Sequence, residues 1–142
     1  MKTRYLTVEE VILAHDIIMM KYGGGGTGVR DESGLEAAVY RPQAEHFGVE
    51  VHPAFWRKAA VLTQSLIQGH YFHDGNKRTA YAALEVFTRL NGYILTVSNE
   101  EAENTMVQIA SEDSFAGEEG LDSLSQLLES WCMKQEKDKK DS

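Results

Sequence analysis

The chain has 142 residues, a length that favours one domain with its own core. Hydrophobic residues make up 42% and charged residues 25%, which are ordinary globular values and exclude a mostly disordered or fibrous chain. The 22 acidic residues outnumber the 14 basic ones, so the surface repels nucleic acid overall and no direct nucleic-acid partner is expected.

The beginning of the chain shows no targeting or membrane segment. Its apolar run is interrupted by Glu9, Glu10, His15 and Asp16 before it reaches the length of a signal peptide or a membrane span. The single cysteine, Cys132, excludes an intrachain disulfide and a zinc site made of several cysteines. We therefore expect a cytoplasmic protein that has no membrane partner.

The first part of the chain predicts two helices. Thr7 and Glu10 form a capping-box pattern, and apolar residues then recur at helical spacing, which predicts a helix over residues 7–22. The glycines that follow end this helix. Asp31 is suited to cap a short second helix that runs to Val39 or Tyr40.

The middle of the chain predicts an extended segment followed by a central helix. Residues 43–51 lack a helical period and predict an extended loop or a small hairpin. Residues 54–68 carry apolar or small side chains on nearly every side, which is typical of a helix that is buried all round. Another helix follows a loop over residues 69–76 and ends at Asn91 and Gly92.

The last part of the chain continues this helical pattern. Residues 93–97 predict a short extended segment, and Ser98 with Glu101 forms a second capping-box pattern that opens a helix. A final helix is predicted near residues 121–133. Residues 134–142 are densely charged and predict a flexible, solvated tail.

Positive charge gathers in one segment of this acidic chain. Residues 90–133 contain no Lys or Arg, whereas residues 53–89 contain five basic and only two acidic residues. Such a local excess of positive charge favours the binding of an anion.

Residues 70–78, His-Tyr-Phe-His-Asp-Gly-Asn-Lys-Arg, concentrate reactive side chains between the central helix and the next one. Unpaired N–H groups at a helix start bind phosphate oxygens, and glycine permits a close approach. Arg78 can hold two phosphate oxygens, Asp74 can hold a magnesium ion between them, and His70 can accept a proton from an attacking hydroxyl. These groups together meet the requirements of phosphoryl-type transfer.

An alternative interpretation of the same stretch is a metal site. His73 and Asp74 form the dyad of helical metal-dependent phosphohydrolases of the HD type, for which His15 and His52 are the only loose candidates as further ligands. His15 lies on an apolar helical stripe, where a hydrogen-bonded core or boundary histidine is the simpler expectation. His46 and His52 are expected at the surface.

The string at residues 70–78 resembles the signature of the Fic and Doc family, His-x-Phe-x-Asp/Glu-Gly-Asn-Gly/Lys-Arg, and matches every fixed position. The likeness to the Doc (death-on-curing) branch extends over about residues 5–128 and includes Gly-Val-Arg-Asp at residues 28–31. It implies an all-α fold, a compact Fic-fold helical bundle with a short flap loop or hairpin. We expect a single domain over residues 1–133, followed by the charged tail over residues 134–142.

The resemblance also assigns roles to residues of the motif. In this family the histidine is the base, the acidic residue binds Mg²⁺, and the residues after it hold the phosphates of a nucleotide. The resemblance therefore implies Mg²⁺ as cofactor and ATP as co-substrate. Carried to this chain, it makes His70 catalytic, Asp74 the metal residue, and Gly75, Asn76, Lys77 and Arg78 nucleotide-binding.

Lys77 stands where family members that attach AMP to proteins usually carry glycine. In the Doc branch a lysine here accompanies a reversed nucleotide and transfer of the γ-phosphoryl group to a threonine of elongation factor Tu. The resemblance thus implies a protein kinase that is the toxin of a toxin-antitoxin pair and arrests translation. It further implies a flap over about residues 41–51 that clamps the target, and an antitoxin whose disordered tail folds onto the toxin.

Three other functions remain open at this stage. The chain can be a Fic-type AMP transferase, or a catalytically degenerate Fic-fold module that binds a partner without turnover. It can also be a DNA regulator that uses residues 77–89 as a recognition helix, although its negative net charge opposes this interpretation.

Overall fold

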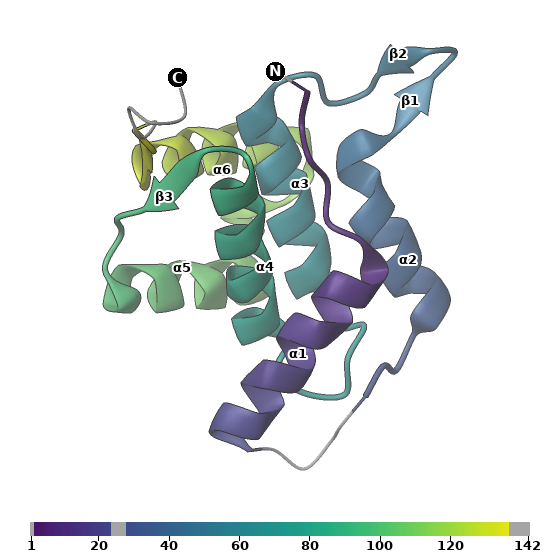
Figure 1. Ribbon diagram of the computed structural model, residues 1–142, viewed down its shortest axis with the longest axis vertical. Helices are drawn as coiled ribbons and strands as arrows, with labels where there is room; N and C mark the ends of the chain where they lie inside the picture. Colours follow the sequence, from purple (N-terminus) through teal and green to yellow (C-terminus); the bar gives the residue numbers. More distant parts are fainter. Residues whose placement is uncertain (1, 24–27, 137–142) are drawn as a thin grey trace.

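The computed structural model describes residues 2–23 and 28–136. Six helices and two pairs of short strands make up this part of the chain, so the predicted all-α fold is confirmed (Figure 1). The elements are α1 (Val8–Tyr22), α2 (Glu32–Tyr40), the 3₁₀ turn η1 (Arg41–Gln43), β1 (Glu45–His46), β2 (Val49–Glu50), α3 (Phe55–Gln68), α4 (Asn76–Leu90), β3 (Tyr93–Leu95), α5 (Asn99–Ser111), η2 (Asp113–Phe115), α6 (Gly117–Ser130) and β4 (Cys132–Lys134).

Helix α3 is the centre of the bundle. All of its residues from 58 to 67 are buried, as expected for a helix covered on every side. Helices α2, α4, α5 and α6 pack around it, and α1 lies against α4 (Figure 1). The prediction that this helix is the centre of the fold is confirmed. Within the described residues, every helix is too short or too polar to cross a membrane.

Helix starts follow the local signals in the sequence. The Thr7 hydroxyl accepts the Glu10 N–H at 3.2 Å, and the Glu10 carboxylate accepts the Thr7 N–H at 2.9 Å, which completes the predicted capping box of α1. The Asp31 carboxylate caps α2 as predicted. At the start of α5, the Ser98 hydroxyl accepts the Glu101 N–H at 3.1 Å. This is one of the two hydrogen bonds of the second predicted capping box.

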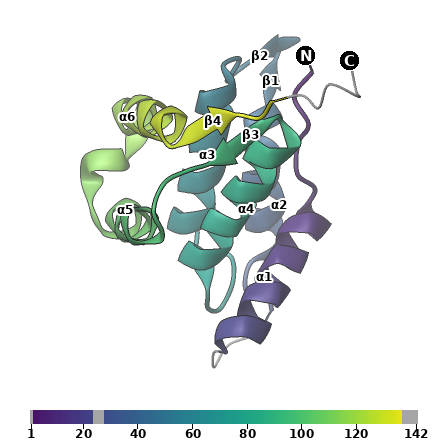
Figure 2. The same cartoon turned by 60° about the vertical axis from the view of Figure 1, so that its left-hand side comes forward.

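The end of the chain differs from the prediction. Helix α6 stops at Ser130, and Cys132–Lys134 form strand β4, which pairs antiparallel with β3 (Figure 2). The prediction of a helix to residue 133 and of a tail that begins at Lys134 was therefore wrong at this boundary. The physical reason is a partner strand about 40 residues away, which local periodicity does not reveal. Residues 137–142 of the expected tail lie outside the described residues.

The predicted hairpin is present as β1 and β2, which pair antiparallel across a turn formed by Phe47 and Gly48. Both turn residues have positive φ, of 52° and 80°, as tight hairpin turns require. The hairpin lies beyond the N-terminal end of α3, whereas residues 69–75 follow its C-terminal end (Figures 1 and 2). The 14 residues of α3 separate the two by about 21 Å. The hairpin thus lies away from the motif loop, and the role of residues 41–51 as a flap that clamps a target stays a prediction.

Candidate active site

The motif loop, residues 69–75, connects α3 to α4 and runs beside the start of α2. An antiparallel bridge joins its Phe72 to Val29, on the segment that precedes α2. The carbonyl of Tyr71 accepts the Arg30 N–H at 2.7 Å and the N–H of the next residue at 3.1 Å. The path of the loop backbone is therefore fixed by a second segment of the chain.

His70, the predicted base, lies exposed in this loop. Its φ of 49° is in the left-handed region, which histidine tolerates better than most side chains. The Nε–H of Arg30 donates to the His70 carbonyl oxygen at 2.8 Å and ties this peptide to the segment before α2. An imidazole on a fixed backbone at the surface is accessible to a hydroxyl group of another protein.

The start of α4 has the features of an anion site. Gly75 is the N-cap residue with φ of 76°, and a Cβ atom there would lie 3.0 Å from the Met19 sulfur, so glycine is required on two grounds. The first N–H groups of α4 have no carbonyl partner within the helix, and its dipole favours negative charge at this end. Phosphate oxygens therefore fit at this helix start.

Asp74 and Asn76 flank Gly75 and have different surroundings. The Asp74 side chain is exposed, and its Oδ1 accepts the Gly75 N–H at 2.7 Å. The Asn76 side chain accepts the Phe72 N–H at 3.1 Å and donates to the Phe72 carbonyl at 2.9 Å. The Asn76 side chain thus bonds to the backbone of the motif loop, and its backbone N–H is among the first N–H groups of α4, which have no carbonyl partner within the helix.

Lys77 and Arg78 supply positive charge in the first turn of α4, and both are exposed. The Arg78 guanidinium carbon lies 4.1 Å from the centre of the Tyr22 ring at the end of α1, within the range of a cation–π contact. Lys77 takes part in no ion pair within residues 2–23 and 28–136. The two cations are therefore available to an anion that approaches the helix start.

The other cations of the basic segment lie elsewhere, which corrects the prediction that the whole segment favours an anion. Arg57 pairs with two carboxylates of α6, and Lys58 is buried with its Nζ 2.9 Å from a carboxylate of β2. Both stand near the N-terminal end of α3, away from the motif loop. Of the basic segment, Lys77 and Arg78 are the cations that lie in the first turn of α4, directly after the motif loop.

Asp74 is suited to a magnesium ion that arrives with a nucleotide. In sites that handle phosphates, Mg²⁺ takes one or two protein carboxylates, and waters and substrate phosphates supply the other ligands. One exposed carboxylate next to a phosphate-binding helix start fits this coordination.

Comparison with known proteins shows the family of this chain. The model of the Fic/DOC family matches residues 5–88, which include the motif loop and most of α4. The chain belongs to the Fic/DOC family. It is 44% identical over 113 residues to a protein named Toxin Doc from Mycolicibacterium smegmatis, covering 78% of this chain and 84% of that protein. It is 35% identical over 113 residues to Protein kinase doc of Escherichia phage P1, covering 80% of this chain and 88% of the relative.

The alternative HD-type metal site does not assemble in this Fic/DOC chain. His52 lies beside the hairpin, near the other end of α3 from His73, and His15 contacts the motif loop through a backbone carbonyl. No group of three or more His, Cys, Asp or Glu side chains comes together in the described residues. His52 is also buried, with 6% of its surface exposed, so the expectation of a surface group was wrong.

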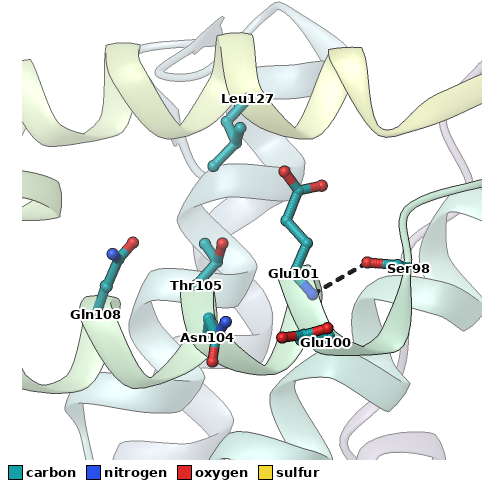
Figure 3. A pocket seen from close by; sticks show the side chains of 7 residues that line it. All are labelled: Ser98, Glu100, Glu101, Asn104, Thr105, Gln108 and Leu127. Atoms are coloured by element: carbon teal, nitrogen blue, oxygen red, sulfur yellow. Dashed lines mark hydrogen bonds between the residues drawn. The ribbon is translucent and has the colours of Figure 1, made fainter.

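Two hollows in the surface help to place the site. A groove of about 310 Å³ lies between α2 and α3 and runs from Arg41 to Tyr71 at the motif loop. A larger hollow of about 470 Å³ lies between α5 and α6 (Figure 3), with Glu100 and Glu101 in its wall. Its acidic lining opposes an anion, and the motif residues take no part in it. Of these two hollows, the groove between α2 and α3 is the one that reaches the motif loop.

Two residues that contact the motif loop were not assigned to the site from the sequence. His15 was expected to be a hydrogen-bonded core or boundary residue, and this is confirmed, but its partner is the Asp74 carbonyl at 2.8 Å. Arg30 holds the His70 carbonyl from 40 positions earlier in the chain. The signal available for His15 was a polar ring on an otherwise apolar helix face.

Proposed function

We propose that this Fic/DOC chain is a protein kinase that transfers the γ-phosphoryl group of ATP to a hydroxyl of a protein target and acts as a Doc-type toxin. The observation that carries the proposal is the set of exposed side chains around one helix start: His70, Asp74, Lys77 and Arg78. One relative is named a toxin and the other a protein kinase, which supports both halves of the proposal.

The proposed reaction is an in-line exchange of one P–O bond for another. The target hydroxyl oxygen forms a bond to the γ-phosphorus while the bond from that phosphorus to the β–γ bridging oxygen breaks, and ADP leaves. His70 accepts the hydroxyl proton during the attack, an effect worth about 10²- to 10⁴-fold in rate. Arg78 and the N–H groups at the start of α4 stabilise the charge that develops on the phosphoryl oxygens. A bound Mg²⁺ would neutralise phosphate charge from the Asp74 side.

Lys77 favours phosphoryl transfer over AMP transfer in this proposal. Its side chain and charge follow directly after Asn76, at the helix start where an AMP-transferring member carries glycine. A triphosphate that cannot place its inner phosphates there would enter reversed and present its γ end to His70. We therefore expect Lys77→Gly to lose kinase activity.

The proposed target is elongation factor Tu, whose modification arrests translation. The test incubates the purified chain and Mg²⁺ with purified elongation factor Tu, and in parallel with a cell lysate, using ATP labelled on either the α or the γ phosphate. We expect γ label on the target and none with His70→Ala. Val107→Ala is the matched control, because Val107 is exposed on α5 and lies outside both the motif loop and the predicted flap.

Each other result of this test changes the proposal in a defined way. Label from the α phosphate would overturn the kinase and favour the AMP transferase. Label from the γ phosphate on a lysate protein other than elongation factor Tu would overturn only the choice of target. No label on any protein, together with normal growth of cells that express the chain, would favour the catalytically degenerate Fic-fold module.

The proposed partner is an antitoxin whose disordered tail folds onto this chain. Helix α1 leaves Leu13, Ile17 and Met20 exposed by 59%, 56% and 87%, a spacing that places them on one helix face. Such an unpaired apolar face suits an amphipathic partner segment. We expect Ile17→Asp to weaken co-purification with a co-expressed antitoxin, while Val107→Asp on α5, also exposed, leaves it unchanged.

A further inference from the structure

We infer that His15 of α1 is a positioning residue for the proposed kinase site, because it holds the peptide that carries Asp74 against the start of α4. This inference rests on the proposed function only for its effect on turnover. That His15 holds the motif loop in place can be tested by measurements on the loop that need no transfer activity.

The contacts of His15 are short and buried. Only 1% of the His15 side chain is exposed, and its Nε2 lies 2.8 Å from the Asp74 carbonyl oxygen. Its ring stacks on Phe72, with the ring centres 3.9 Å apart and the planes 9° from parallel. Gly75 lies against the same ring, since a Cβ there would be 3.7 Å from its Nε2 and Cδ2. One buried side chain thus contacts two residues of the motif loop and lies close to a third.

The carbonyl partner fixes which ring nitrogen carries the proton. A carbonyl oxygen only accepts hydrogen bonds, so Nε2 must be the donor. Nδ1 is buried without a hydrogen-bond partner in the described residues, and the nearest carboxylate oxygen, on Asp16, is 3.9 Å away. The hydrogen bond to the motif loop is therefore the specific polar contact of this buried ring, and the rest of its surroundings is packing.

The effect on the site follows from the order of the residues. Asp74 presents the carboxylate, and its own carbonyl is the atom that His15 holds. The N–H of Gly75, which belongs to the same peptide group as that carbonyl, donates to the Asp74 carboxylate at 2.7 Å. Loss of the His15 hydrogen bond would leave the Asp74 peptide free to rotate, which would move the carboxylate and the first N–H groups of α4 together.

Three substitutions of His15 separate the hydrogen bond from packing. His15→Phe keeps a stacked ring but has no donor. His15→Gln places an amide donor near the position of Nε2, whereas His15→Asn has the same amide one methylene shorter and does not reach. His46→Phe on the hairpin is the matched control, because that histidine is exposed and lies at the other end of α3.

The first readout is hydrogen–deuterium exchange of the motif loop in the full chain. The second is calorimetric binding of a non-hydrolysable ATP analogue with Mg²⁺. We expect the Phe and Asn variants to exchange faster in residues 70–78 and to bind about tenfold more weakly, as losses of partners around metal sites do. We expect the Gln variant to stay within about threefold of the wild type, and kcat to follow the same order.

Two results would overturn the inference. One is wild-type exchange and binding in His15→Phe, and the other is equal impairment of the Gln and Asn variants, which would indicate a packing role alone. Should the Phe variant fail to fold, the comparison of the Gln and Asn variants still tests the hydrogen bond. The ¹⁵N spectrum of the wild-type His15 ring is a further test, because a proton on Nδ1 instead of Nε2 contradicts the inference. Loop exchange that responds to His15 in a chain without transfer activity would refute the proposed function and leave the positioning intact.

Discussion

The ion pair between Lys58 and Glu50 yields a sharp prediction, because its two partners differ in burial. The Lys58 ammonium is 2% exposed and donates to the Glu50 carboxylate at 2.9 Å and to the Pro42 carbonyl at 3.3 Å. The Glu50 side chain is 45% exposed. Removal of Glu50 leaves a buried charge without its counter-ion, whereas removal of the Lys58 charge leaves a carboxylate that water can solvate.

We therefore expect Glu50→Ala to destabilise the fold and Lys58→Met to change its stability little. Loss of one partner of a fully buried pair costs about 3–5 kcal/mol, and the exposure of Glu50 reduces this to about 2–3 kcal/mol for Glu50→Ala. Lys58→Met keeps the unbranched stem in the core, so we expect its unfolding free energy within about 1 kcal/mol of the wild type. At about 3 °C per kcal/mol, the thermal unfolding midpoint falls by about 6–9 °C in Glu50→Ala and by less than about 3 °C in Lys58→Met.

Urea denaturation of the two variants and of the double variant measures this difference. Burial alone would lower the pKa of Lys58, but the hydrogen bond to Glu50 and the neighbouring Tyr5 hydroxyl outweigh burial and raise the pKa above 10.5. The stabilisation by this ammonium is thus complete below pH 10.5 and is lost as the pH rises through the folded-state pKa, a loss absent from Lys58→Met. A larger loss in Lys58→Met than in Glu50→Ala would refute the reasoning.

Three further predictions concern other parts of the chain. Burial, aided by Arg41 and Arg57, lowers the pKa of His52 below 6.5. The free energy of unfolding should therefore fall as the pH drops below 6.5, because the unfolded chain binds the proton more readily. His52→Gln should remove this pH dependence in urea denaturation at a series of pH values. Burial raises the pKa of Cys132 from 9.0 to about 11, so iodoacetamide at pH 8 should alkylate the folded chain about 100-fold more slowly than the unfolded one; equal rates would contradict this. Gly75→Ala should lower the free energy of unfolding by about 1–2 kcal/mol in urea denaturation, because the left-handed φ and the nearby Met19 sulfur both oppose a Cβ.

Local signals in the sequence predict the helices well because each signal acts within a few residues. The caps at Thr7 and Asp31 satisfy N–H groups three positions ahead, and the apolar pattern of residues 54–68 reports directly on burial. Strand β4 has no such signal, since its three residues are stable only through pairing with β3. The same limit explains Lys58, whose buried charge is paired by a half-exposed carboxylate that the hairpin brings beside it.

The candidate site was predictable for a related reason. His70, Asp74, Lys77 and Arg78 lie within nine consecutive positions, so no knowledge of the fold is needed to bring them together. Their supports come from elsewhere in the chain: Arg30 reaches the loop across 40 positions and His15 across 59. A single sequence shows the reactive side chains but gives no pattern for such distant backbone contacts.

The distribution of counter-ions along α3 explains why only one end of this helix is suited to a phosphate. At its N-terminal end, the carboxylates of α6 and β2 neutralise Arg57 and Lys58, and these cations stabilise the fold instead of binding an anion. Beyond its C-terminal end, Lys77 and Arg78 stand at the start of α4 without a carboxylate partner in the described residues. Because the chain as a whole is acidic, cations without a carboxylate partner favour an anion, and Lys77 and Arg78 are such cations at the helix start that follows the His70 loop.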